Sequence, residues 1–307
     1  MVTKVPSTTL PGNLMASKRV LDRTIDRLAV RSRLLRFKLL NRWRSDGISR
    51  RQASFTPRDI PPVGWDMLRA VREQGVGLLP GIAALLGPAS GAIVDDLVRR
   101  GSGAWHWPAE GLLESEDIYT LAPEVYRLGL EPGLLDLAEN YLAEPCFYMG
   151  CSMKREGVTS SMAGTRQWHL DIEDDRMLRV IMYLNDVELG GGTFSYIDRA
   201  ASAMARSRLN YASGYVPDTQ MRVVADESSW NRVLAPAGGV LAFDGTKIFH
   251  RVERPTARER FSLSLTYSTR HPRQVMRVVR LQQQSRRDLL ASLSERQRAC
   301  IPSPRYL

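Results

Sequence analysis

The residues of this chain best suited to chemistry are two histidines and an aspartate, His169, Asp171 and His250. His169 and Asp171 lie two residues apart, and His250 follows Asp171 by 79 positions. The chain has only four histidines, so this pattern uses half of them. Two imidazoles and one carboxylate on one face of a metal leave coordination positions open, the arrangement found in non-haem Fe(II) oxygenases. The pattern therefore predicts a metal centre built from these three side chains.

Short strands are needed to position these ligands, and the sequence around them predicts several. Side chains at i and i+2 of a strand share one face, so a His-x-Asp on a strand edge aims both ligands at one point. Runs rich in β-branched and aromatic residues, separated by glycine-containing turns, occupy residues 178–184, 193–197, 240–243, 249–252 and 260–268. In the last run apolar and hydroxyl side chains alternate, which predicts one buried face. These features predict an α+β protein with a double-stranded β-helix core, a cupin-like jelly roll, flanked by N- and C-terminal helices.

The same residues carry a resemblance to a known family. The motifs are Gln-Trp-His-Leu-Asp at 167–171, Tyr-Leu-Asn-Asp-Val at 183–187 with Gly-Gly at 191–192, then His250 and an Arg-x-Ser at 260–262. Together they resemble the Fe(II)/2-oxoglutarate-dependent dioxygenase superfamily. They are most similar to the phytanoyl-CoA dioxygenase-like branch, with some prolyl-hydroxylase-like features. The resemblance covers roughly residues 70–270.

The resemblance implies a role for each motif residue. His169, Asp171 and His250 would bind Fe(II). Arg260 would pair with the distal carboxylate of the cosubstrate 2-oxoglutarate, with Ser262 beside it. Tyr183 matches a position from which related enzymes hydrogen-bond the same carboxylate. Oxygen would be the second cosubstrate, ascorbate a candidate reductant, and succinate and carbon dioxide the co-products.

Arg260 also has a physical reason to bind a carboxylate. Its planar guanidinium fits a carboxylate through two parallel hydrogen bonds, which lysine cannot do. A charge directed into a barrel is costly unless it is paired. We therefore expect water or a buffer anion beside Arg260 in the free protein and the cosubstrate's carboxylate in the complex. In halogenating relatives a small apolar residue replaces the ligand carboxylate, so Asp171 favours hydroxylation or another oxidation.

Three functions remain as alternatives from the sequence. The first is oxidation of a C–H bond in a small or carrier-bound metabolite, and the second is hydroxylation of a protein side chain, as in prolyl hydroxylases. The third is a non-catalytic barrel that uses a basic segment for binding. The complete ligand set and Arg260 argue against the third. No peptide-binding repeat is appended, which favours a metabolite over a protein substrate.

The net charge of +10 is concentrated near the N-terminus. Residues 17–58 hold thirteen Lys or Arg against three Asp, interleaved with apolar residues in the pattern of a basic amphipathic helix. We expect this helix to pack on the core with its basic face in solvent. An anionic membrane surface or an acidic partner stays an alternative, and no specific contact with nucleic acid is expected.

Composition and length predict the remaining organisation. We expect a basic extension at 1–60, a helical support segment at 61–145, the oxygenase core at 146–272 and a C-terminal helix and tail at 273–307. Three cysteines without zinc spacing indicate a reducing compartment, and no signal peptide is visible, so a cytoplasmic location is expected. The apolar stretch at 76–94 is interrupted by prolines and glycines, so it predicts a strand, a turn and a helix.

Several other segments have functional and structural alternatives. The insert between strands at 198–230 is expected to border the substrate as a lid and to order partly on binding. His106 is expected to make a packing or loop contact, and His271 to lie in an exposed turn. The acidic residues 173–175 are expected to form a solvated turn.

Overall fold

The computed structural model describes residues 52–159, 161–273 and 280–303. The chain divides into two compact units, Met1–Phe55 and Thr56–Leu307, and nearly all the described residues belong to the second. The basic segment predicted over residues 17–58 therefore lies mostly outside the described residues. Within the described ranges, no helix has the length and apolar character that a membrane crossing needs.

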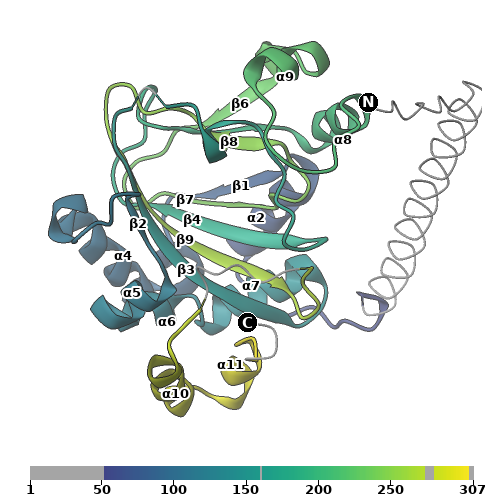
Figure 1. The fold of residues 1–307 in the computed structure, drawn as a ribbon. Helices are drawn as coiled ribbons and strands as arrows, with labels where there is room; N and C mark the ends of the chain where they lie inside the picture. Colours follow the sequence, from purple (N-terminus) through teal and green to yellow (C-terminus); the bar gives the residue numbers. More distant parts are fainter. Residues whose placement is uncertain (1–51, 160, 274–279, 304–307) are drawn as a thin grey trace, which may run out of the picture. The chain divides into compact units, whose positions relative to one another are not determined.

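The strands of the second unit form two antiparallel sheets (Figure 1). The larger sheet has the order β1-β7-β4-β9-β3-β2 and the smaller one the order β6-β5-β8. The larger sheet comprises β1 (Val76–Leu79), β2 (Leu112–Leu113), β3 (Cys146–Glu156), β4 (Met177–Tyr183), β7 (Val240–Phe243) and β9 (Arg260–Thr269). The smaller sheet comprises β5 (Phe194–Ile197), β6 (Trp230–Val233) and β8 (His250–Val252).

A hydrophobic cluster joins the two sheets. Tyr183 of β4 and Phe243 of β7 pack with Phe194 of β5 and Val233 of β6 in one buried group. Side chains from both sheets thus meet in a common interior, as they do when a jelly roll closes on itself. This arrangement confirms the predicted double-stranded β-helix core.

Helices cover the other face of the larger sheet (Figure 1). They are α2 (Pro62–Glu73), α3 (Ala83–Leu86), α4 (Pro88–Arg100), α5 (Ser115–Leu121), α6 (Pro123–Leu128), α7 (Pro132–Leu142), α10 (Gln283–Ser292) and α11 (Glu295–Ala299). Four of them, α2, α4, α6 and α7, begin with a proline at the first turn, where its missing N–H costs nothing. The predicted flanking helices are therefore present at both ends of the core.

The burial of strand β9 differs from what its sequence pattern predicted. Both of its faces are buried, although the alternation of its side chains had predicted a single buried face. Phe261, Leu263 and Leu265 pack into the helix-covered cluster. The opposite face carries Arg260 and the hydroxyl residues, and it lines a cavity. The polar half of the alternation thus marks an internal cavity and not bulk solvent.

The insert at 198–230 folds into helices. It contains α8 (Arg199–Arg208) and α9 (Asp218–Val224), and Asp198 caps α8 by accepting a hydrogen bond from Ala201 N at 2.8 Å. Trp168, Met221, Trp230 and Phe249 form a third buried cluster beneath this insert. The insert therefore packs directly on the segment that precedes His169.

Candidate metal centre

Backbone hydrogen bonds bring the three predicted ligands together. His169 and His250 form an antiparallel bridge, in which each backbone N–H donates to the other residue's carbonyl oxygen at 3.1 Å. Asp171 N donates to Gly245 O at 2.8 Å, in the turn between β7 and β8. His169 and Asp171 lie outside the named strands, so bridge pairing and not a full strand positions them. Segments almost 80 residues apart in sequence thus converge at one point.

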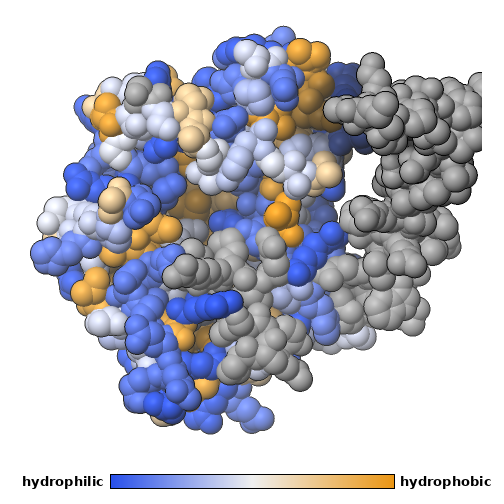
Figure 2. Space-filling view, viewed as in Figure 1, coloured by the Kyte–Doolittle hydropathy of each residue, from blue (hydrophilic) through white to orange (hydrophobic). Residues whose placement is uncertain are grey.

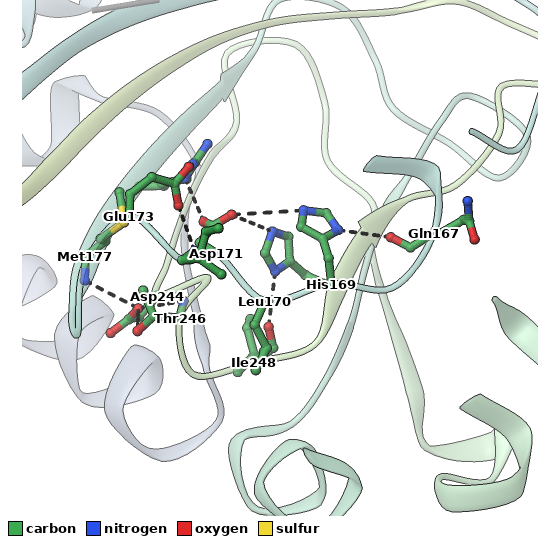
Figure 3. A network of polar contacts seen from close by, with 12 residues as sticks. Gln167, His169, Leu170, Asp171, Glu173, Met177, Asp244, Thr246 and Ile248 are labelled. Atoms are coloured by element: carbon green, nitrogen blue, oxygen red, sulfur yellow. Dashed lines mark hydrogen bonds and ion pairs between the residues drawn. The ribbon is translucent and has the colours of Figure 1, made fainter. Parts of the chain in front are cut away.

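The donor atoms of the three residues lie close together, and Figure 3 shows the His169 imidazole and the Asp171 carboxylate directed toward one another. His250 Nε2 lies 3.7 Å from Asp171 Oδ1, and His169 Nε2 lies 4.0 Å from the same oxygen. One ligand atom from each residue falls within 4.8 Å of the others. This spacing suits three donors arranged around a single ion.

The second nitrogen of each imidazole is held by the backbone. His169 Nδ1 lies 2.9 Å from Gln167 O, and His250 Nδ1 lies 3.1 Å from Ile248 O. A carbonyl can only accept, so each Nδ1 carries the proton and donates it. Each Nε2 is left with its lone pair directed at the shared centre, which is how metal-binding histidines are usually oriented.

Electrostatics keep His250 and Asp171 in the forms that bind metal. Burial, together with the neighbouring His169, lowers the pKa of His250 to about 3, so its imidazole is neutral at physiological pH. Burial acts to raise the pKa of Asp171, but the interactions with Arg179 and the two histidines together outweigh burial, and the pKa falls below its usual value. Neutral imidazoles and an ionised carboxylate are the forms that metal binding requires.

Arg179 is a site residue that the sequence did not single out. Its Nε lies 2.9 Å from Asp171 Oδ2, while Asp171 Oδ1 faces the histidines. One carboxylate oxygen is thus held by Arg179, and the other is left for a metal. The available signal was a lone arginine inside the apolar run 178–184, since a charge on a buried strand needs a partner.

Gly245 has no side chain, and the Asp171 carboxylate occupies the space that a side chain there would fill. A Cβ at this position would lie 2.1 Å from Asp171 Oδ2 and 2.9 Å from His250 Cε1. Any other residue would displace a ligand, so the turn requires glycine. The three donors, their fixed tautomers and this clearance together fit an Fe(II) ion held on one face.

A cavity of about 510 Å³ opens beside the three ligands. Its lining includes all three donors and, from β9, Arg260 and Ser262. In the space-filling view the surface is hollowed between the two sheets (Figure 2). The structure thus places Arg260 and Ser262 in the same cavity as the ligand set.

Tyr183 is near Arg260 but occupies a different position. It is fully buried, and the Arg260 guanidinium carbon lies 6.0 Å from the centre of its ring. Burial raises the pKa of Tyr183 to about 12, so its hydroxyl stays protonated. Tyr183 is absent from the cavity lining formed by the described residues, so its contact with a cosubstrate stays a prediction.

The expected environment of Arg260 was wrong in one respect. The protein itself supplies a counter-ion, the buried carboxylate of Glu156, with Arg260 Nη2 3.0 Å from Glu156 Oε2. Glu156 lies 104 residues before Arg260 in the chain and belongs to no sequence motif. Only the pairing of β3 with β9 reveals the contact.

Other expectations have mixed outcomes. Asp174 is buried and accepts hydrogen bonds from Thr269 N and Oγ1, at 2.9 and 2.7 Å, so the predicted solvated acidic turn was wrong. Glu173 is also buried, and its Oε1 lies 3.4 Å from Arg179 Nη2.

The two histidines outside the candidate centre, His106 and His271, are exposed. Tyr215, in the insert at 198–230, lines the cavity and packs edge-on against the His169 ring, with the two ring centroids 5.4 Å apart.

Known proteins resemble this chain in fold. No protein-family model matches the sequence, and no curated protein matches it. Among solved structures, EvdO2 from Micromonospora carbonacea var. aurantiaca has 16% identity and a TM-score of 0.48, covering 71% of this chain and 94% of EvdO2. HygX from Streptomyces hygroscopicus, solved with nickel, 2-oxoglutarate and hygromycin B, has 16% identity and a TM-score of 0.47, covering 66% and 86%. SnoN, a non-haem α-ketoglutarate-dependent epimerase from nogalamycin biosynthesis, has 15% identity and a TM-score of 0.43, covering 69% and 85%. Because these identities and scores are low, the chemistry of this site follows from its own donor geometry.

Proposed function

We propose that this chain is a non-haem Fe(II)- and 2-oxoglutarate-dependent dioxygenase that hydroxylates, or otherwise oxidises, a C–H bond of a small or carrier-bound metabolite. The observation that carries this proposal is the convergence of His169 Nε2, His250 Nε2 and Asp171 Oδ1 beside a cavity that also contains Arg260. The ligands and the cationic residue thus share one space. A metal ligand set without a carboxylate-binding group would fit many other activities equally well.

The residues of the chain divide the work of the reaction. When bound, Fe(II) supplies the activation of O2 that C–H oxidation requires. His169, Asp171 and His250 hold the ion on one side and leave the cavity side open. Arg260 and Ser262 hold the distal carboxylate, which orients the 2-oxo acid for chelation. For a hydroxylation, 2-oxoglutarate, O2 and R–H become succinate, CO2 and R–OH, so one oxygen atom of O2 enters succinate and the other enters R–OH.

The cavity favours a small substrate over a protein side chain. Its volume of about 510 Å³ falls in the range of roughly 300–1,000 Å³ found for small-molecule sites. Tyr215 and Gly214 of the insert line it, which supports the prediction that the insert borders the substrate. Hydroxylation of a protein side chain stays an alternative, since a single extended side chain would also enter such a cavity.

Succinate release tests the proposal directly. The full chain is incubated with iron and 2-oxoglutarate against a panel of metabolites and peptides, with and without oxygen. We expect oxygen-dependent succinate that rises with one class of substrate and is lost in His250→Ala. Absence of succinate from every mixture, in a protein shown to bind iron, would count against the enzyme and favour a binding protein.

A further inference from the structure

Arg260 belongs to a cluster of four charged side chains, of which Arg260 and Glu156 are buried and Lys154 and Arg166 are partly exposed. Glu156 Oε2 is 3.0 Å from Arg260 Nη2, and Glu156 Oε1 is 3.0 Å from Lys154 Nζ and 3.9 Å from Arg166 Nη2. The side chains of Arg260 and Glu156 are only 4% and 1% exposed. One carboxylate therefore serves three cations, and Arg260 has its counter-ion before any ligand arrives.

Strand pairing fixes this contact. Glu156 and Lys154 of β3 are the cross-strand partners of Arg260 and Ser262 of β9. Alternation places all four side chains on one face of the sheet, so Glu156 stands opposite Arg260 as a direct neighbour. Lys154, Arg260 and Ser262 line the cavity, whereas Glu156 is absent from that lining within the described part of the chain. Glu156 thus holds Arg260 from outside the cavity.

Glu156 remains charged in this setting. Burial acts to raise its pKa, but Arg260 and Lys154 outweigh burial and hold the pKa below its usual value. A ligand carboxylate that reaches Arg260 from the cavity would meet a guanidinium already paired with an ionised carboxylate. Two like charges then share one cation in a site of low exposure, where repulsion is poorly screened.

From this geometry, and resting on the proposed function, we propose that Glu156 is a resident counter-ion of Arg260 that competes with the distal carboxylate of the 2-oxo acid and sets its affinity. Glu156 stabilises the free protein because a buried arginine without a partner is costly. The same charge weakens cosubstrate binding. Lys154 and Arg166 offer Glu156 other partners when the cosubstrate occupies Arg260.

Two other roles for Glu156 predict different outcomes. If Glu156 only braced Arg260 in its binding orientation, its removal would weaken cosubstrate binding. If it only stabilised the fold, its removal would leave cosubstrate affinity unchanged. Competition alone predicts a less stable free protein together with tighter cosubstrate binding.

The test uses Glu156→Gln in the full chain, because glutamine keeps the shape and a hydrogen-bonding oxygen but removes the charge. Binding of 2-oxoglutarate is measured by calorimetry under anaerobic conditions with Fe(II), and thermal unfolding is measured with and without the cosubstrate. We expect about tenfold tighter binding, corresponding to about 1.4 kcal/mol, a lower Tm without 2-oxoglutarate and a larger rise in Tm when it is added.

Glu259→Gln is the matched control. Glu259 immediately precedes Arg260, and its Oε2 lies 2.8 Å from Arg155 Nε, at the border of a different pocket. Its substitution therefore also removes one negative charge next to β9, but not the one that faces Arg260. We expect its cosubstrate affinity to equal that of the wild type. Equal or weaker binding in Glu156→Gln overturns the proposal, as does a Glu156→Gln protein that stays unfolded even with saturating 2-oxoglutarate. If the wild type itself binds no 2-oxoglutarate with metal, the proposed function fails instead.

Discussion

His169 and His250 are prepared for metal binding by contacts at the nitrogen that does not bind. Each Nδ1 donates to a carbonyl two residues earlier in the chain, so both imidazoles present Nε2 to the same point. Arg179 holds one oxygen of Asp171 and leaves the other toward the histidines. The geometry of the candidate centre is thus set by local hydrogen bonds and one ion pair within the protein.

His250→Ala tests this centre. We expect turnover to be abolished and most of the iron affinity to be lost, because the three ligands hold the ion jointly. The fold should survive with a loss of about 1 to 3 kcal/mol in the free energy of unfolding, the usual range for one buried side chain. Iron titration and thermal unfolding measure the two effects. The exposed His106 provides the control, since His106→Ala should match the wild type, and full activity in His250→Ala contradicts the assignment.

Substitution of Arg260 separates cosubstrate binding from metal binding. A charge-assisted pair contributes on the order of 1.5 to 3 kcal/mol, so Arg260→Ala should raise the dissociation constant of 2-oxoglutarate about tenfold to a hundredfold. Iron affinity should hardly change, because Arg260 is not a ligand. Arg260→Lys should restore only part of the loss, since lysine keeps the charge but not the planar fork. Unaltered 2-oxoglutarate binding in Arg260→Ala means that the carboxylate site lies elsewhere.

The residue types and their spacing singled out His169, Asp171, His250 and Arg260, which the fold brings to one cavity, but not the partners of these residues. Arg179 and Glu156 belong to no motif, and each acts on a residue that only the folded sheets bring within reach. The alternation of apolar and polar residues along a strand predicts which face of that strand is polar. It does not predict which charged residue of the neighbouring strand will pair with a given residue.

At the scale of elements, the turn between β7 and β8 is as important as the strands that carry the ligands. It supplies the carbonyl that accepts from Asp171 N and the missing side chain that leaves room for the Asp171 carboxylate. The sequence predicted a glycine-containing turn between the runs 240–243 and 249–252, and it predicted most strands from their β-branched and aromatic residues. It missed β2, β3 and β6. Strand β6 (Trp230–Val233) carries exposed polar residues at its centre and follows a helical insert.

Gly245→Ala should disable the metal centre while leaving the sheets intact. The added methyl group would lie 2.1 Å from Asp171 Oδ2, so the ligand must move. We expect iron affinity to fall about tenfold or more, as for disturbed contacts that orient metal ligands. Gly103→Ala is the control, because nothing lies within 4 Å of the position of its Cβ. An iron affinity equal to that of the wild type shows that the turn does not constrain Asp171.

The insert at 198–230 is expected to act as a lid, although it already contains two helices. Tyr215 is half exposed and borders the cavity, so a bound substrate would bury it further. We expect limited proteolysis within 198–230 to slow when substrate and cosubstrate are both present. The same cleavage rate with and without them argues for a fixed wall.

At the scale of the unit that contains the site, helices pack on one face of the larger sheet. The other face of that sheet and the smaller sheet enclose the cavity that is lined by His169, Asp171, His250 and Arg260. Under the proposed function, this one cavity holds both a metal and a 2-oxo acid, and the two bind each other as well as the protein. Binding of the two must therefore be coupled, because chelation is possible only when the metal is present.

The most direct measurement is the affinity of the full chain for 2-oxoglutarate, determined by anaerobic calorimetry with Fe(II) and again after removal of metal by a chelator. We predict binding about tenfold or more tighter with Fe(II), and loss of this difference in His250→Ala. Equal affinity with and without the metal in the wild type would contradict the account.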